Sequence, residues 1–137
     1  MSLEKYRREA DRWFLQAKAD LRAAGNSAAS DSFDWACFQA QQAGEKALKA
    51  LWLSYAYDPW GHSLVKLIED FPDEQVRSEL LAFMPHAKRL DKLYIPTRYP
   101  NGLPDSIPAD VFTEDEARAA MRTAEELLEE LSGRLSS

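Results

Sequence analysis

Several residue types and patterns that define whole classes of protein are scarce or missing in this sequence of 137 residues. A single cysteine, Cys37, excludes both an intrachain disulfide and a cysteine-based metal cluster, and it fits a reducing compartment. The two histidines, His62 and His86, lack the close spacing of zinc ligands. Gly-rich phosphate loops and the Gly-x-Ser-x-Gly nucleophile elbow are also missing. We therefore expect no bound metal and no other cofactor.

Long hydrophobic runs and excess positive charge are missing as well. No window approaches the roughly 20 apolar residues of a membrane span, and no apolar signal core follows the charged first residues. We therefore expect a cytoplasmic protein that does not associate with membranes. The chain has 17 Lys and Arg against 23 Asp and Glu, for a formal net charge of −6. This balance disfavours a general coat for DNA or RNA but is compatible with a local basic patch.

The residues that are present are typical of a globular domain. Apolar residues make up 45% and charged residues 29% of the chain, and its length is enough for a buried core. Apolar residues recur at steps of three and four, as on the faces of helices, and no segment predicts a strand. We expect one domain over residues 1–137, an all-α up-and-down helical bundle of four long helices and one short one.

The apolar periodicity predicts five helices, over residues 3–24, 31–55, 64–71, 73–94 and 113–135. We expect Gly25 and Asn26 to end the first helix. Alanines repeat along one face of the second helix and allow another helix to approach closely, so we expect it to be central. These are Ala36, Ala40, Ala43, Ala47 and Ala50. Pro85 interrupts the fourth pattern and predicts either a kink or a new helix that begins there.

Residues 96–112 carry a proline at every fourth position, beginning with Pro96. Proline is incompatible with a helix interior, so we expect a loop of 17 residues, a length at which loops are often functional. Thr113 and Glu116 form a capping box that begins the last helix.

A strip of polar side chains follows one side of the second helix, with Gln42, Glu45, Lys46 and Lys49 at steps of three and four. One interpretation is a solvated helix face that carries an ion pair. The other is a polar wall, either on a groove or in a dimer interface.

The segment Gly61-His62-Ser63-Leu64 stands at the start of the short third helix. Free N–H groups at a helix start can bind a phosphate or another anion. Alternatively, His62 or Ser63 caps the helix. A histidine beside a helix N-terminus tends to stay neutral, which suits a proton acceptor.

The stretch from His86 to Tyr99 is the most basic part of this acidic chain. It holds Lys88, Arg89, Lys92 and Arg98 against one acid, Asp91, with Tyr94 and Tyr99 between and after them. Arginine and aromatic side chains together bind phosphates and stack on bases. The alternative is a helix end in which the helix dipole favours positive charge.

Three ordered motifs resemble the HEPN family of nucleotide- and RNA-associated helical bundles. Residues 36–50, ACFQAQQAGEKALKA, resemble its second-helix signature. Residues 61–64 resemble the next motif, and Leu90-Asp91-x-x-Tyr94-x-x-x-Arg98-Tyr99-Pro100 resembles the one after that. The first helix also fits, with Trp13 and Ala17-x-x-Asp20-Leu21. The resemblance extends over nearly the whole chain.

The resemblance implies a helical bundle that pairs as a homodimer. Small stand-alone HEPN proteins are often encoded beside a minimal nucleotidyltransferase, and many such pairs are toxin–antitoxin modules, so it also implies a nucleotidyltransferase-type partner. In the ribonuclease branch of the family, an arginine that holds the phosphate is followed four to six residues later by a histidine that handles the proton of the RNA 2′-hydroxyl. Here Arg98 is followed over residues 99–105 by no histidine.

We therefore expect a protein that binds a nucleotide or an RNA phosphate and has little or no enzymatic activity. The expected binding residues are Arg98, Tyr99, Tyr94, His62, Lys46 and Gln42. One alternative is a metal-independent endoribonuclease toxin with a rearranged site, for which Arg98 and His62 are the catalytic candidates if the fold or the dimer brings them together. The other alternative is a non-catalytic interaction module. For the dimer interface we expect the exposed sides of Trp52, Tyr55 and Trp60, because aromatic residues are favoured there.

Overall fold

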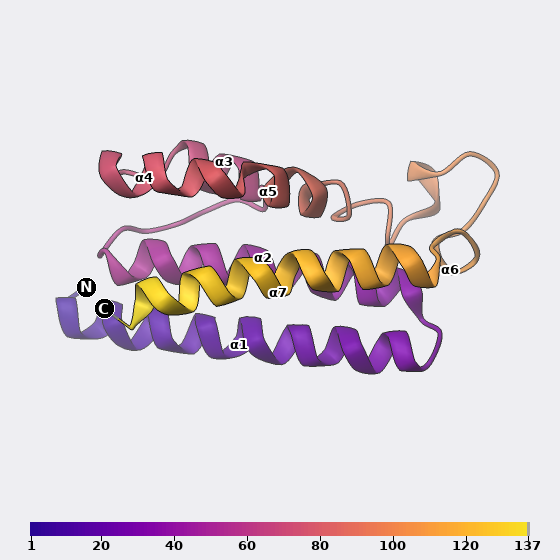
Figure 1. Cartoon of the computed structure of the whole chain (residues 1–137), viewed down its shortest axis with the longest axis horizontal. Coiled ribbons are helices and arrows are strands. Elements are labelled where there is room, and N and C mark those ends of the chain that lie inside the picture. Colours follow the sequence, from indigo (N-terminus) through magenta and orange to yellow (C-terminus); the bar gives the residue numbers. More distant parts are fainter. Residues whose placement is uncertain (137) are drawn as a thin grey trace.

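The computed structural model describes residues 1–136 as layers of helices that lie side by side (Figure 1). The three long helices are α1 (Leu3–Ala29), α2 (Phe33–Ser54) and α7 (Glu114–Leu135). The short helices α3 (Leu64–Glu69), α4 (Glu74–Leu80) and α5 (Met84–Asp91) form a further layer on the side of α2 and α7 away from α1. No strand occurs in residues 1–136, so the predicted all-α helical bundle is confirmed. Along the same residues, no helix combines the length and apolar character that crossing a membrane requires.

The first helix is longer than we predicted. It continues through Gly25 and Asn26 to Ala29, so the expected stop at these residues is wrong. A glycine inside a helix costs only about 1 kcal/mol, which the packing of α1 along α2 outweighs. The chain turns instead at Asp31, whose φ of 60° lies in the left-handed region.

The fourth predicted helix is broken into α4, a 3-10 turn η1 (Leu81–Phe83) and α5. The bundle therefore has three long helices rather than four. Pro85 lies in the first turn of α5, where its missing N–H leaves no helical hydrogen bond unmade. This confirms a new start at the proline. The Pro-rich loop likewise holds two short turns that begin at prolines, η2 (Pro100–Gly102) and α6 (Pro108–Val111).

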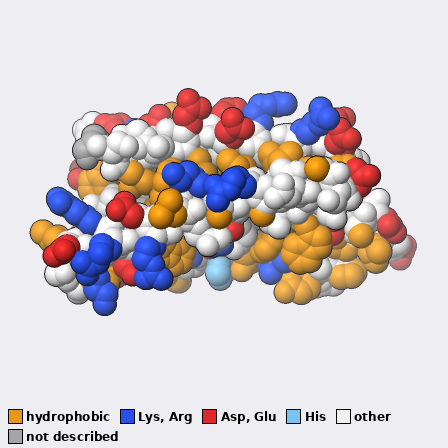
Figure 2. Space-filling view, turned by 90° about the horizontal axis from the view of Figure 1, so that it is seen from below, with side chains coloured by type: hydrophobic (Ala, Val, Ile, Leu, Met, Phe, Trp, Pro, Cys, Tyr) orange, Lys and Arg blue, Asp and Glu red, His pale blue; other side chains and the backbone are white. Residues whose placement is uncertain are grey.

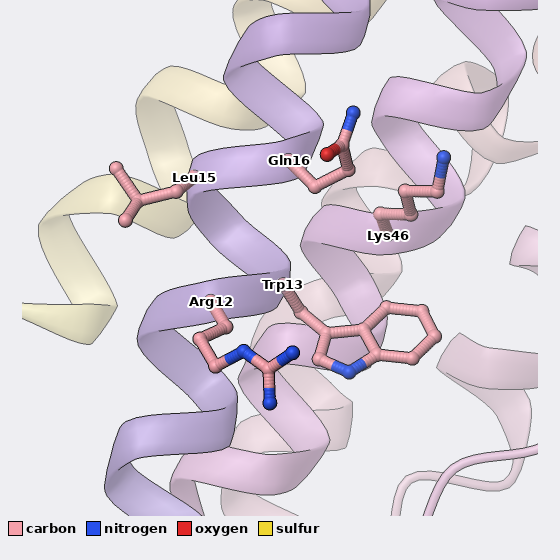
Figure 3. Close-up of a pocket in the computed structure, with 5 residues that line it drawn as sticks. All are labelled: Arg12, Trp13, Leu15, Gln16 and Lys46. Carbon is pink, nitrogen blue, oxygen red and sulfur yellow. The ribbon is translucent and has the colours of Figure 1, made fainter.

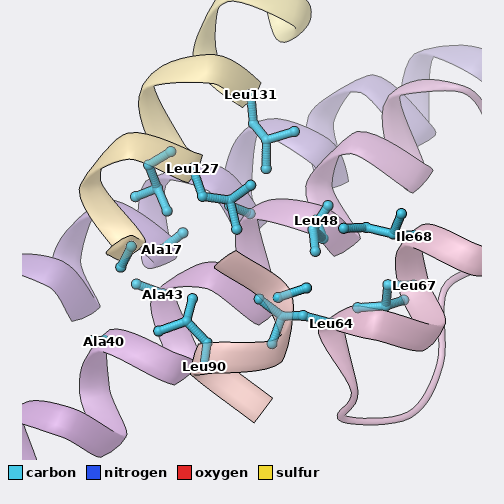
Figure 4. Close-up of a cluster of buried hydrophobic side chains, with 14 of the residues drawn as sticks. Ala17, Ala40, Ala43, Leu48, Leu64, Leu67, Ile68, Leu90, Leu127 and Leu131 are labelled. Atoms are coloured by element: carbon cyan, nitrogen blue, oxygen red, sulfur yellow. The ribbon is translucent and has the colours of Figure 1, made fainter. Parts of the chain in front are cut away.

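The core lies around the small-residue face of α2 (Figure 4). All five alanines of that face are inaccessible to solvent, which confirms the predicted close approach and the central place of α2. Gly44 lies on this helix as well, and a Cβ atom there would lie 2.7 Å from Leu90 of α5 and 2.9 Å from Leu64 of α3. The short-helix layer therefore sits so close to α2 that a methyl group at position 44 would have to displace the ends of the Leu90 and Leu64 side chains.

Cys37 also lies inside this core. Burial raises the pKa of its thiol to about 12, with smaller contributions from the acidic groups of Glu116 and Asp34. The thiolate is the reactive form of cysteine, so this side chain behaves as a small apolar residue at neutral pH.

We predict opposite effects for alanine at two glycines of the long helices. Gly44→Ala should lower the free energy of unfolding by about 1–3 kcal/mol, because the added methyl group overpacks the contact with Leu90 and Leu64. Gly25→Ala is the matched control, since a methyl group added there would have no atom within 4 Å, and it should stabilise by up to about 1 kcal/mol through helix propensity. Urea unfolding followed by circular dichroism measures both. Equal effects would contradict the close approach at Gly44.

Candidate functional site

The fold brings the histidine of the second motif and the arginine of the third to one aromatic ring. The imidazole of His62 stacks on the ring of Tyr94, with centroids 4.9 Å apart and planes at 17°. The guanidinium carbon of Arg98 lies 4.6 Å from the centroid of the same ring. It also lies 4.3 Å from the ring of Phe38 and 5.0 Å from that of Tyr99. Arg98 and His62, far apart in the sequence, are thus neighbours across Tyr94.

The guanidinium of Arg98 is held in place but keeps N–H groups that have no hydrogen-bond partner in residues 1–136. Its Nε and Nη2 atoms donate to the carbonyl of Tyr94 at 3.0 and 2.8 Å. Among residues 1–136, Nη1 has no hydrogen-bond partner. Cation–π contacts and these bonds fix the plane of the group, and the remaining N–H groups are available to an anion.

A buried carboxylate lies behind His62. Glu45 of α2 is 3% exposed, and its Oε2 atom lies 3.1 Å from Nζ of Lys49 and 3.3 Å from Nδ1 of His62. Its Oε1 atom accepts from Nε2 of Gln41 at 3.1 Å. The ammonium group of Lys49 also lies 5.6 Å from the ring centroid of Trp13. The interpretation of the strip as a solvated face is therefore wrong for Glu45 and Lys49, because their neighbours remove them from solvent.

This carboxylate sets the tautomer of His62. An ionised carboxylate can only accept a hydrogen bond, so Nδ1 of His62 must carry the proton in this contact. In the neutral imidazole, Nε2 is then the acceptor, and within residues 1–136 it has no partner. The side chain is 60% exposed, so Nε2 is open to a ligand. The arrangement can take a proton from a hydroxyl group.

The start of α3 is tied to the end of α5. The carboxylate of Asp91 accepts from the backbone N–H groups of Leu64 and Val65 at 2.7 and 3.1 Å, and from the hydroxyl of Ser63 at 2.7 Å. Ser63 in turn caps the helix by accepting from the N–H of Lys66. Capping by Ser63 is confirmed, whereas the anion-binding interpretation of this helix start is wrong because Asp91 already occupies it. Asp91 thus anchors the residues directly after His62, a role that its place in the sequence did not indicate.

The two polar strip residues among the expected binding residues go to different places. Nε2 of Gln42 donates to Oε1 of Gln41 at 2.9 Å, which places it next to the Glu45 network. Lys46 pairs with Asp20 of α1 at 2.5 Å, so its ammonium group already has a carboxylate partner. Lys46 lines a shallow pocket of about 510 Å³ with residues of α1 (Figure 3), which are Arg12, Trp13, Leu15 and Gln16.

The aromatic residues expected at a dimer interface are only partly on the surface. Trp52 is 7% exposed, because α3 covers it and its Nε1 donates to the carbonyl of Leu67 at 2.9 Å, so its expected place at an interface is wrong. Tyr55 and Trp60 are exposed. Seen from the side of α1, hydrophobic side chains also gather along one edge of the molecule, mainly in the half away from the chain termini (Figure 2).

Comparisons with known proteins agree with the motifs. A family model described as the HEPN domain matches residues 10–134. A search of curated proteins gives no match.

Three solved structures share this arrangement of helices. The crystal structure of TT1696 from Thermus thermophilus is 38% identical, with a TM-score of 0.82 over 91% of this chain and 97% of that one. ST0689, described as an archaeal HEPN homologue, is 29% identical, with a TM-score of 0.77 over 93% and 98%. A HEPN domain protein from Thermotoga maritima is 27% identical, with a TM-score of 0.65 over 91% and 98%.

We predict that the Glu45–Lys49 pair behaves as a buried unit. Glu45→Gln should lower the free energy of unfolding by about 3–5 kcal/mol, because it leaves a buried ammonium group without its counter-charge. The double variant Glu45→Gln with Lys49→Met should regain most of this loss. Arg118→Gln is the surface control, because it breaks an exposed ion pair with Glu114 and should cost no more than about 1 kcal/mol. A Glu45→Gln cost as small as that of the control in urea unfolding would contradict the prediction.

Proposed function

The chain belongs to the HEPN family, and on that premise we propose that it binds a nucleotide or an RNA phosphate at Arg98 and works as a homodimer of one-domain subunits. The family relationship supports the dimer. The apolar edge of the surface supports it as well, because contiguous exposed apolar area is typical of interaction sites.

The observation that carries the proposal is the arginine held among aromatic rings. Arg98 keeps N–H groups without a partner in residues 1–136 and lies against Tyr94 and Tyr99. Tyr99 is 47% exposed, so its ring offers a face on which a base can stack. A guanidinium binds phosphate with charge-assisted hydrogen bonds. His62 borders this group through its stack on Tyr94, whereas Gln42 contacts Gln41 and Lys46 pairs with Asp20.

The proposal includes a partner protein. We propose that the dimer acts in the cytoplasm with a nucleotidyltransferase-type protein, as one component of a toxin–antitoxin module. The resemblance of the second-helix, Gly61–Leu64 and Leu90–Pro100 motifs to small HEPN proteins of such pairs supports this. An interaction module without ligand is the outcome that remains if no nucleotide binds.

A second candidate function is metal-independent RNA cleavage, which the convergence of His62 and Arg98 on Tyr94 favours. In this candidate, Nε2 of His62 takes the proton of the RNA 2′-hydroxyl as the 2′-oxygen attacks phosphorus. The P–O bond to the 5′-oxygen of the next nucleotide breaks, this oxygen takes a proton from water and leaves as a 5′-hydroxyl, and a 2′,3′-cyclic phosphate forms. Arg98 holds the phosphate, and Glu45 keeps the imidazole in the required tautomer.

We predict that ligand binding depends on Arg98. Arg98→Ala should weaken the binding of ATP or a short RNA by about 10-fold or more, the factor expected for a charge-assisted hydrogen bond. Arg98→Lys keeps the charge but loses the planar stack and should bind weakly too. Arg22→Ala is the control, since it removes the same charge from an exposed position on α1. Thermal shift measurements across a ligand titration report the affinity. Flat melting curves of the unmodified protein with ATP, GTP and short RNAs would contradict the proposal.

We predict for the second candidate that cleavage depends on His62. RNA incubated with the protein and EDTA should be cut, and His62→Ala should slow the cut by about 100-fold or more, as for loss of a general base. His86→Ala is the matched control, because that histidine contacts Glu126 of α7 rather than the proposed site, and the variant should leave the rate unchanged. Intact RNA after incubation with nuclease-free protein would exclude this candidate while leaving the binding proposal in place.

A further inference from the structure

A pocket of about 320 Å³ is lined in part by His62, the histidine that also stacks on Tyr94. It lies between α3 and the segment that joins α2 to α3, which crosses the molecule from the end of α2 (Figure 1). His62 lines this pocket and also stacks on Tyr94, whose other contacts include Arg98. The proposed phosphate-binding residues and this pocket therefore share one side chain, that of His62.

The walls of the pocket combine a fixed apolar floor with an open aromatic side. Trp52 and Leu67 are buried below it, and the hydrogen bond from the indole of Trp52 to the carbonyl of Leu67 fixes the floor. Trp60 lines the side and is 81% exposed, more than any other large apolar side chain in residues 1–136. An indole ring exposed at the side of a pocket offers a free face on which a ligand ring can stack.

The backbone presents Trp60 and His62 from one turn. Gly61 stands between them with a φ of 86°, a conformation in the left-handed region that favours glycine. The tie from Asp91 to Ser63 and Leu64 then anchors the segment directly after His62. The turn at Gly61 and the helix cap directly after His62 thus fix the backbone that carries the rings of Trp60 and His62.

The rim carries charges of both signs, which suits a base better than an apolar peptide side chain. Lys66 and Asp70 line the pocket beside Ser63. The ammonium of Lys66 lies 3.6 Å from Glu69 at the surface, an exposed contact that holds it weakly. Asp70 can accept from base N–H groups, and Lys66 can donate to base ring nitrogens or carbonyl oxygens.

We infer that this pocket is the base-binding subsite of the nucleotide or RNA site, where a purine stacks on Trp60 while a phosphate of the same ligand lies at His62 and Arg98. The inference rests on the proposed function and names the class of ligand, one with a purine base joined to phosphate. A purine offers the larger stacking face, and stacking of this kind needs no particular base-pairing edge.

The test uses two five-unit oligomers with equal charge. One is 2′-O-methyl adenylate, which lacks the hydroxyl needed for cleavage, and the other is an abasic backbone with the same number of phosphates. Calorimetric titration of the unmodified protein, Trp60→Ala, Trp60→Phe and Arg98→Ala with each oligomer gives the affinities. Because Trp60 is so exposed, its variants should keep the fold, and circular dichroism melting verifies this.

Trp60→Ala should weaken the binding of the adenylate oligomer by at least about fivefold, the lower end of the effect of losing one base–aromatic stack. Trp60→Phe should stay close to the unmodified protein, because a phenyl ring still stacks. Trp60→Ala should leave the affinity for the abasic oligomer unchanged, whereas Arg98→Ala should weaken the binding of both oligomers.

Adenylate binding that is equal in Trp60→Ala and the unmodified protein would overturn the base subsite while the Arg98 dependence preserved the proposed function. If Trp60→Ala binds the adenylate as well as the unmodified protein does but has a different oligomeric mass, Trp60 belongs to a protein interface. This result would also overturn the base subsite. No binding of either oligomer by the unmodified protein would remove both proposals.

Discussion

The carboxylate of Glu45, buried in the middle of α2, is the group on which the site depends. A buried charge is stable only when it is paired and hydrogen-bonded, and Glu45 has Gln41, Lys49 and His62 within 3.3 Å. Two of these partners come from α2 itself, whereas His62 comes from the segment before α3. The need to satisfy one carboxylate therefore couples the central helix to the histidine and sets which imidazole nitrogen faces solvent.

The layer that carries His62 can take this position because two other constraints agree with it. Gly44 allows Leu90 and Leu64 to approach the backbone of α2, and Asp91 joins the end of α5 to the start of α3. Short helices have little stability of their own. The packing at Gly44 and the shared carboxylate of Asp91 therefore help to hold α3 and α5 in register, and the ring of Tyr94 lies against His62.

In the proposed site, neighbouring groups have separate chemical tasks. Arg98 supplies positive charge in a fixed plane, the aromatic rings supply stacking faces, and His62 supplies a nitrogen that accepts a proton. An acidic protein can in this way bind an anion locally, because the field near a ligand depends on the nearest oriented groups more than on net charge. The charge of −6 and a phosphate site are compatible for this reason.

The sequence by itself determined the all-α class, the approximate place of the long helices, the small-residue face of α2 and the family motifs, and it offered a new start at Pro85 as one of two outcomes, because periodicity, capping and proline geometry are local properties. It also pointed to Arg98, Tyr94 and His62 as separate candidates. Only the tertiary structure decided that Glu45 and Lys49 are buried, that Asp91 occupies the start of α3 and that His62 and Arg98 meet at one ring. Burial and long-range pairing depend on what packs against a residue, and no pattern of spacing along one helix contains that information. Gly25 is an example in which a local signal was misleading. The residue predicts a helix end, but α1 continues through it because the helix packs against α2.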